Sequence, residues 1–320
     1  MNEKQFAAAK DGFKHLPVLY REVVEYLGAL KGPCRIIDGT LGSGGHSSLI
    51  LQANPEAVLM GIDRDGDALK RAEEKLAFAA DRVKLMRGNF SELADLAKSI
   101  GWESVDGILL DIGISSPQID DAARGFALRL DGPLDMRMDK RSQVTASRIL
   151  NNSSEVELAR IFYEYGEERR SRRLARAVVE RRKEKPFERT LEFADFCEKV
   201  LGKSRPGKLP TPTKCFQALR IAVNDELGEL EKALEEALPL LNKGGKLAVI
   251  SFHSLEDRMV KEFFKEQAAS CVCPPGLPVC MCSHEAKIKI LTRKPLTAKK
   301  DEIEFNRRAA SAKLRIAEKL

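Results

Sequence analysis

The fold is decided by the stretch IIDGTLGSGGH at residues 36–46. A short apolar run ends in the carboxylate of Asp38, and four glycines follow within seven residues. The last of them, Gly45, begins a predicted helix. Glycine lets the backbone turn tightly and approach a ligand closely. An open α/β sheet uses this arrangement at the carboxyl end of its first strand to bind a cofactor. We therefore expect an α/β domain with a cofactor site.

Strands and helices are predicted to alternate through the first part of the chain. The predicted strands are residues 35–38, 58–63, 83–86 and 107–111, and the predicted helices between them are residues 45–53, 67–76 and 91–99. The carboxylate of Asp67 is placed to cap the second of these helices. This alternation predicts a parallel, doubly wound sheet.

The pattern changes after the fourth strand. Only helical periodicity is visible in residues 122–212, and a proline-, glycine- and lysine-rich linker ends this region at residues 203–212. A helix at 213–241 and a strand at 246–252 then resume the α/β pattern. We predict a Rossmann-like α/β sheet domain made of residues 1–121 and 213–320. An all-helical, basic, substrate-binding domain at 122–212 interrupts it.

Composition and charge limit the class of protein. The chain is 43% hydrophobic and 32% charged, and it has no apolar run of eighteen residues, so we expect no membrane span and a cytoplasmic protein. The formal net charge is +6, but residues 122–212 and 287–320 each carry +7. Two basic blocks on an otherwise acidic chain favour a polyanionic substrate, although solvated helix faces explain either block alone. We make no prediction of oligomeric state.

The glycine-rich stretch does not fit a dinucleotide. A dinucleotide site requires Gly-x-Gly-x-x-Gly, and Ser47 stands where the third glycine is needed. Asp63, at the end of the second predicted strand, suits the ribose hydroxyls of a nicotinamide or an adenosyl cofactor. Asp38 suits a cationic ligand better than a pyrophosphate. S-Adenosyl-L-methionine carries a sulfonium charge and no phosphate, so we expect it as the methyl donor.

The fourth predicted strand indicates the reaction. It ends at Asp111, and Ser115, Ser116 and Pro117 follow closely. Enzymes that methylate an exocyclic amine of a base carry an Asp/Asn/Ser-Pro-Pro-aromatic loop at this place, which Ser116-Pro117 resembles without its second proline and aromatic residue. The lone pair of such an amine is delocalised into the ring, so acceptors must orient its N–H groups. We predict Asp111, Ser115, Ser116 and Pro117 as the catalytic set.

Longer blocks extend this comparison over nearly the whole chain. These blocks are residues 15–19, 38–46, 110–120, 124–126, 131–139, 216–227, 250–258 and 311–315. In these blocks the chain resembles the ribosomal small-subunit methyltransferase H family. The resemblance implies that the sheet domain is a class I methyltransferase domain, and that it transfers a methyl group from S-adenosylmethionine to the N4 amine of a cytosine in 16S rRNA. It also implies a substrate within the decoding region of the assembled small ribosomal subunit.

The resemblance also implies a set of cofactor contacts. They are Gly44, Gly45, His46, Asp63, Phe90, Asp111 and Gln118. Asp38 is added to this set because its negative charge suits a cationic ligand. Asp63 is expected to accept hydrogen bonds from both ribose hydroxyls, and Phe90 to form an apolar wall for adenine. His46 is expected to make a backbone contact at a helix start rather than to carry a proton.

Three further segments have weaker assignments. Residues 131–139 mix charged side chains with methionines, and we interpret them as an active-site lid or a solvated turn. Gln217, Arg220 and Asn224 share one helix face, which meets RNA, meets the lid or bridges the two domains. Residues 169–185 hold nine basic side chains against two acidic ones, and we predict that they bind phosphates.

Four of the seven cysteines are crowded into one short segment, as the pairs Cys271-x-Cys273 and Cys280-x-Cys282. Reduced thiols are expected in a cytosolic protein. The two pairs have the composition of a zinc site, with His284 as an alternative ligand, but Cys-x-Cys is tighter than the usual ligand spacing. A reduced, proline-stiffened surface loop is the alternative. The predicted catalytic set contains no metal.

Two other functions compete with the methyltransferase. A nicotinamide dehydrogenase conflicts with Ser47 and with the loop at Ser116. A non-catalytic RNA-binding assembly factor conflicts with the retention of Asp38, Asp63 and Asp111. The methyltransferase therefore explains the sequence best.

Overall fold

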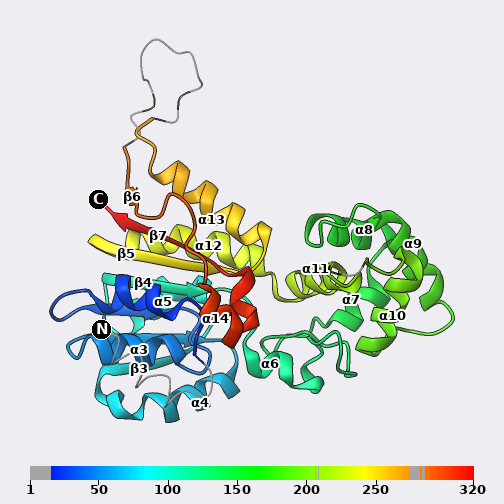
Figure 1. Ribbon diagram of the computed structural model, residues 1–320, viewed down its shortest axis with the longest axis horizontal. Helices are drawn as coiled ribbons and strands as arrows, with labels where there is room; N and C mark the ends of the chain where they lie inside the picture. Colours follow the sequence, from blue (N-terminus) through cyan, green and yellow to red (C-terminus); the bar gives the residue numbers. More distant parts are fainter. Residues whose placement is uncertain (1–15, 206, 208, 272, 274–281, 283–284) are drawn as a thin grey trace. The chain divides into compact units, whose positions relative to one another are not determined.

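A computed structural model describes residues 16–205, 207, 209–271, 273, 282 and 285–320. The chain forms two compact units, which are each described by themselves (Figure 1). The first unit consists of Met1–Gly113 and Glu229–Leu320, and the second of Ile114–Gly228. None of the helices in the described ranges has the length and hydropathy of a membrane span.

The first unit is built on a seven-stranded sheet with the order β3-β2-β1-β4-β5-β7-β6. The strands are β1 (Arg35–Asp38), β2 (Val58–Asp63), β3 (Val83–Arg87), β4 (Val105–Asp111), β5 (Leu241–Ser251), β6 (Ile288–Ile290) and β7 (Lys313–Lys319). The first five strands pair in parallel, and β7 pairs antiparallel with both β5 and β6. The predicted α/β class with a Rossmann-like sheet is confirmed.

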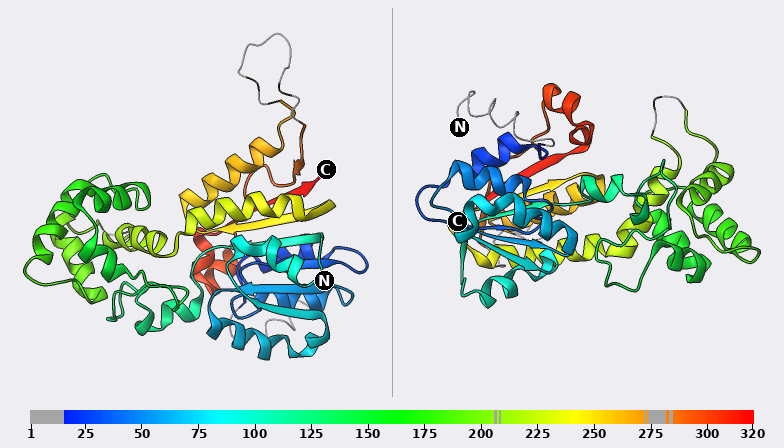
Figure 2. Two further views of the ribbon diagram at one scale, coloured as in Figure 1. Left: turned by 180° about the vertical axis from the view of Figure 1, so that it is seen from behind. Right: turned by 90° about the horizontal axis from the view of Figure 1, so that it is seen from below.

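Helices cover both faces of this sheet (Figures 1 and 2). One face packs against α5 (Leu93–Ser99), α12 (Glu226–Leu240) and α13 (Ser254–Gln267). The other packs against η1 (Val24–Gly28), α3 (Gly45–Ala53), α4 (Gly66–Leu76) and α14 (Lys300–Phe305); α2 (Tyr20–Val23) precedes η1. Because both faces are buried, β1 and β4 read as continuous apolar runs rather than as alternating ones.

The second unit is helical (Figure 2). Its helices are α6 (Ser116–Asp120), α7 (Ala146–Asn152), α8 (Glu155–Glu164), α9 (Ser171–Arg182), α10 (Thr190–Leu201) and α11 (Pro212–Asn224). Their apolar faces enclose a core in which Phe162, Phe187 and Phe193 are fully buried. The Phe187 ring meets the Phe193 ring edge to face, with centroids 5.6 Å apart. Such aromatic pairs stabilise a core by about 1 kcal/mol beyond the area they bury.

The units differ from the expected boundaries at 121/122 and 212/213. Residues 114–121 and 213–228 fall in the helical unit. The second range does so because Cys215, Phe216 and Leu219 of α11 pack in the core of that unit. The single helix predicted at 213–241 is two helices, since the backbone of Asp225 adopts φ 49° between α11 and α12.

Two other details of the sequence interpretation need correction. The cap of α4 is Asp65 rather than Asp67, and its side chain accepts a hydrogen bond from the Asp67 N–H. The antiparallel strand β7 was not predicted from its sequence. It forms because its apolar side chains, including Leu314 and Ile316, complete a core that distant segments build.

Candidate active site

Three carboxylates lie at the carboxyl ends of three adjacent strands. Asp38 ends β1, where it pairs with Gly61 of β2 and Leu109 of β4. Asp63 and Asp111 each lie two residues further along these strands. The neighbouring strands therefore extend beyond β1 on both sides. The chain leaves β1 for β2 on one side and returns through β4 on the other, so this edge is the topological switch point where α/β sheets bind ligands.

The glycine loop, residues 39–46, follows β1 and lies between the ends of β2 and β4, which extend beyond β1. The Gly39 N–H donates to the Leu109 carbonyl and the Leu41 N–H donates to the Ile62 carbonyl, both at 2.9 Å, so the loop is tied to both flanking strands. A Cβ on Gly39 would stand 2.7 Å from Leu110 Cδ2 and 3.2 Å from Phe90 Cβ, so any larger residue forces the Leu110 side chain to move. Glycine at this position lets the loop lie close to the sheet.

Asp38 holds the glycine loop to the start of α3. Its side chain is 1% exposed. One oxygen accepts a hydrogen bond from the Ser47 hydroxyl at 2.6 Å, and the other accepts one from the Thr40 N–H at 3.2 Å. Burial raises the pKa of Asp38 to about 6 in spite of these two donors. Both oxygens are therefore engaged by the loop and α3, which explains why a carboxylate is needed at the end of β1.

Asp63 also fixes the loop but keeps acceptor capacity. One oxygen accepts from the Gly42 N–H and the other from the Asp65 N–H, both at 2.8 Å. Burial raises the pKa of Asp63. Each carboxylate oxygen has two lone-pair sites, so one site on each oxygen remains for a ligand. This pattern suits a pair of vicinal hydroxyl groups.

Asp111 has an unsatisfied acceptor. Its Oδ1 atom is buried and has no hydrogen-bond partner within the described residues, and its Oδ2 atom lies 3.5 Å from His46 Nδ1. Burial, and then the nearby carboxylates of Asp38 and Glu256, raise the pKa of Asp111 to about 8. Leaving a buried acceptor without a donor is unfavourable by about 1–3 kcal/mol. The arrangement therefore favours a cationic or hydrogen-bond-donating ligand at this oxygen.

His46 is a neutral side chain that packs against Asp111. Its Nε2 lies 2.8 Å from the Val18 carbonyl, which only accepts hydrogen bonds, so the proton is on Nε2. Burial lowers the pKa of His46 to about 4. The Nδ1 lone pair consequently faces the Asp111 carboxyl. An imidazole with this pKa is neutral at neutral pH and keeps its single proton on Nε2. The role of His46 toward a cofactor stays a prediction.

Phe90 and Gln118 lie in different units. Phe90 is 7% exposed and packs in the core of the sheet unit with Ile37 and Leu110, and its Cβ is 3.2 Å from the position that a Cβ on Gly39 would take. Gln118 belongs to the helical unit, where its Oε1 accepts from the Ser115 N–H at 3.0 Å. Ser115 caps α6, so Ser116 and Pro117 form the first turn of that helix.

Three residues of the sheet-unit site were missed from the sequence. The Thr40 hydroxyl accepts from the Asp111 N–H, and the Ser47 hydroxyl donates to Asp38. Glu256 is fully buried at the start of α13, where it accepts from the Phe252 N–H at 2.8 Å and the His253 N–H at 3.2 Å. Its position three residues after the cap residue His253 is a capping-box signal that the sequence contains.

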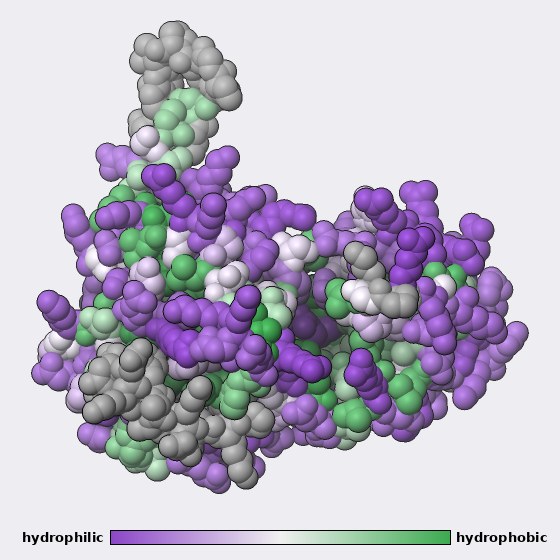
Figure 3. Space-filling model, in the orientation of Figure 1, coloured by the Kyte–Doolittle hydropathy of each residue, from purple (hydrophilic) through white to green (hydrophobic). Residues whose placement is uncertain are grey.

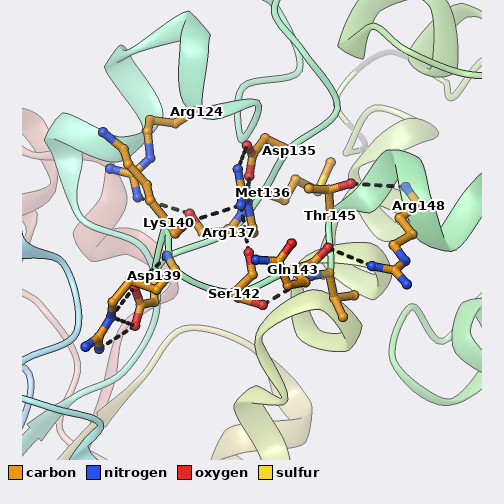
Figure 4. Close-up of polar contacts among 12 residues, drawn as sticks. Arg124, Asp135, Met136, Arg137, Asp139, Lys140, Ser142, Gln143, Thr145 and Arg148 are labelled. Atoms are coloured by element: carbon orange, nitrogen blue, oxygen red, sulfur yellow. Dashed lines mark hydrogen bonds and ion pairs between the residues drawn. The ribbon is translucent and has the colours of Figure 1, made fainter.

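Residues 131–139, expected as a lid or a solvated turn, form an ordered part of the helical unit (Figure 4). Their apolar members Leu134, Met136 and Met138 are at most 4% exposed and join that unit's core. Between them, the Arg137 guanidinium donates to both oxygens of Asp135 at 2.7 Å and to two nearby carbonyls (Figure 4). The segment is therefore not a solvated turn, while its role as an active-site lid stays a prediction.

The polar face of α11 binds other parts of the helical unit. The Asn224 amide accepts from the Met138 N–H and donates to the Met136 carbonyl, both at 2.8 Å. Arg220 forms a bidentate pair with the buried Glu226 at 2.7 and 2.8 Å, and Gln217 donates to a carbonyl at the end of α8. Of the alternatives for this face, the contact with residues 131–139 is confirmed at Asn224.

The basic segment 169–185 forms α9 and its flanks. Arg181 and Arg182 are used internally, since they bond to Glu192 and to carbonyls of neighbouring helices. Arg172 and Arg173 are exposed and form no ion pair within the described part of the chain. The surface over α8 and α9 is largely hydrophilic on the face shown in Figure 3. The helix therefore presents cationic side chains to solvent.

Comparison with known proteins gives a match over almost the whole chain. The model of the MraW methylase family matches residues 12–320. A protein of Heliobacterium modesticaldum named ribosomal RNA small subunit methyltransferase H is 50% identical over 96% of this chain and 99% of its own length. Proteins of the same name from Geobacter sulfurreducens and Carboxydothermus hydrogenoformans are 49% and 47% identical, with 96% of this chain covered and 99% and 98% of their own.

Proposed function

Because the chain belongs to the MraW methylase family, we propose that it transfers a methyl group from S-adenosylmethionine to the N4 amine of a cytosine in 16S rRNA. The observation that carries the proposal is the buried oxygen of Asp111 beside the glycine loop, which finds no hydrogen-bond donor in the part of the chain that the structure describes. The relatives from Heliobacterium modesticaldum and Geobacter sulfurreducens match this chain over 99% of their own length. Both are named as small-subunit rRNA methyltransferases, which supports rRNA as the substrate.

S-Adenosylmethionine fits the charge and hydrogen-bonding capacity of the strand-end site, which is formed by Asp38, Asp63 and Asp111 at the carboxyl ends of β1, β2 and β4. Asp63 retains one acceptor site on each oxygen for the ribose hydroxyls, and Gly39 brings the loop backbone down to the sheet, close to Phe90. The carboxylate of Asp38 and the ionised form of Asp111 attract a sulfonium ion. S-Adenosylmethionine supplies an electrophilic methyl carbon when it is bound. The proposed cofactor contacts are Asp38, Gly44, Gly45, His46, Asp63, Phe90, Asp111 and Gln118.

In the proposed mechanism the chain's own residues position the amine. Asp111 and the Ser115–Pro117 segment, four residues further along the chain, accept hydrogen bonds from the N4 amine and orient its lone pair. The amine loses its proton after transfer, so a strong general base is not required. Positioning and exclusion of water provide most of the rate enhancement. An amine in a paired base is inaccessible, so the cytosine must be flipped out or single-stranded.

The helical unit is proposed to bind the RNA backbone. Arg172, Arg173 and Arg176 of α9 are exposed, and Arg172 and Arg173 lie four and three residues before Arg176, the spacing of one helix face. Contacts of arginine with phosphate position a protein without reading sequence. We further propose that the substrate is the assembled small subunit in the cytoplasm, with the methylated cytosine in its decoding region.

The proposal is tested by labelled-methyl transfer to small-subunit particles from a strain that lacks the protein, followed by nucleoside analysis. Wild-type protein is expected to produce N4-methylcytidine. Asp111→Asn should lower the rate by at least ~100-fold, the effect of removing one group that contacts the reacting centre. Asp95→Asn, at an exposed position of α5, is the matched control and should keep the wild-type rate. Asp111→Asn with near-normal activity would exclude Asp111 from the reacting centre.

A further inference from the structure

Three cysteines outside the proposed active site converge on one point. Cys271, Cys273 and Cys282 have sulfur atoms that all lie within 4.8 Å of one another. Cys271 is exposed and the other two are half-buried, so an ion reaches the three sulfurs without passing through the core. The sequence-based alternatives included Cys280 and His284, which lie outside the described residues.

The sulfur geometry distinguishes a metal site from a disulfide. The Cys282 and Cys271 sulfur atoms are 3.8 Å apart. A disulfide requires about 2.05 Å. A tetrahedral zinc ion with zinc–sulfur bonds of about 2.3 Å places two thiolate sulfurs about 3.8 Å apart. The two sulfurs thus stand at the separation that a single shared zinc ion sets.

A backbone hydrogen bond supports thiolate character at Cys271. The Cys273 N–H donates to the Cys271 sulfur at 3.4 Å, which becomes possible because the two cysteines are separated by one residue. Hydrogen bonds to a ligating sulfur orient the ligand and stabilise its charge. The Cys-x-Cys spacing therefore lets the backbone N–H of Cys273 donate to the Cys271 sulfur.

The cluster is joined to the edge of the sheet. It lies between α13 and β6, and the Lys287 N–H donates to the Gln267 carbonyl at 2.8 Å, which ties the end of the helix to the start of the strand (Figure 1). α13 begins after the carboxyl end of β5 and runs back along the sheet, so the cysteines lie at the edge opposite to Asp111. The cluster is separate from the proposed methyl-transfer site.

We propose that Cys271, Cys273 and Cys282 bind one structural zinc ion as thiolates. The ion links Cys271 and Cys273, which follow α13, to Cys282, which precedes β6. Binding releases a proton from each thiol that ionises, and no electron is transferred. This assignment does not depend on the proposed methyl transfer.

The test is metal analysis of protein purified under reducing conditions from zinc-supplemented cells. About one zinc ion per chain is expected in the wild type, and at least a tenfold lower zinc content in Cys271→Ser, Cys273→Ser and Cys282→Ser. Cys34→Ser is the matched control, because Cys34 lies at the start of β1 and contacts Asn54. This variant should keep its zinc.

A second measurement uses cobalt in place of zinc. Chelator-treated wild-type protein titrated with Co²⁺ should develop the visible absorption of tetrahedral thiolate coordination, and the Cys282→Ser variant should not. Wild-type protein that carries no zinc and takes up neither ion would overturn the proposal. A preparation that contains iron, or a disulfide between Cys271 and Cys282 in the purified protein, would also overturn it.

Discussion

The ionisation of Asp111 makes donor binding depend on pH. The pKa of Asp111 is raised to about 8, so about nine-tenths of the ligand-free protein carries the neutral acid at pH 7. A cationic donor favours the ionised form. Binding at pH 7 should therefore release about 0.9 proton, and the dissociation constant of S-adenosylmethionine should fall about tenfold between pH 6 and pH 7. The α-amino group of the donor stays charged over this interval.

Isothermal titration calorimetry in buffers of different ionisation enthalpy measures both the affinity and the number of protons released. Asp111→Asn should abolish most of the pH dependence. The remaining change should be no more than about twofold, because Asp38, with a pKa of about 6, still titrates. His46 contributes nothing, since its pKa is about 4. Asp95→Asn, on the exposed side of α5, should behave as wild type. A wild-type dissociation constant that changes less than twofold, with no proton release, would refute the reasoning.

Three other predictions concern stability and RNA binding. The folded pKa of Asp111 lies above its unfolded value, so the wild type loses up to ~1.4 kcal/mol of stability per pH unit between about pH 4 and pH 8. Asp111→Asn should therefore melt at a higher temperature than wild type at pH 8 and at a similar one at pH 4. Gly39→Ala should lower the unfolding free energy in urea by ~1–3 kcal/mol, because its Cβ overlaps Leu110. Replacing Arg172 and Arg173 with alanine should reduce the slope of log binding constant against log salt by about 1.4, measured with single-stranded RNA.

Two of these predictions have a matched control. Gly45→Ala places its Cβ at an ordinary 3.4 Å from Pro17, so it should destabilise less than Gly39→Ala. An equal loss for both would contradict the steric argument. Lys183→Ala removes a charge that is already paired with Glu180, so it should change the salt slope less than Arg172→Ala. If Asp111→Asn leaves the Tm at pH 8 unchanged, ionisation of the buried Asp111 carboxyl does not destabilise the folded protein.

The sheet and the strand-end site were predictable because their signals are local. β1 and α3 have the predicted bounds, 35–38 and 45–53, since an apolar run followed by glycines specifies a strand, a tight turn and a helix within a few residues. Asp38, Asp63 and Asp111 each follow an apolar run directly. Parallel strands place such residues at one edge whatever else the chain does.

Errors arose where distant segments compete for the same residues. The helical pattern at 213–241 continues through Asp225 in the sequence, but α11 ends there because its apolar face packs in the helical unit. β7 pairs with β5 across more than sixty residues of chain, so no local pattern reveals it. The sequence did not reveal the burial of the methionines in residues 131–139, because the core that buries them is assembled from helices far along the chain.

The sequence by itself determined the class of fold, the order of the strands that carry carboxylates and the glycine loop between them. Only the tertiary structure decided that both oxygens of Asp38 hold the loop while Asp111 keeps an unsatisfied acceptor, and that three cysteine sulfurs meet. The physical reason is that hydrogen bonding, burial and pKa depend on distances between residues far apart in the chain. Residue types and their spacing limit those distances but do not set them.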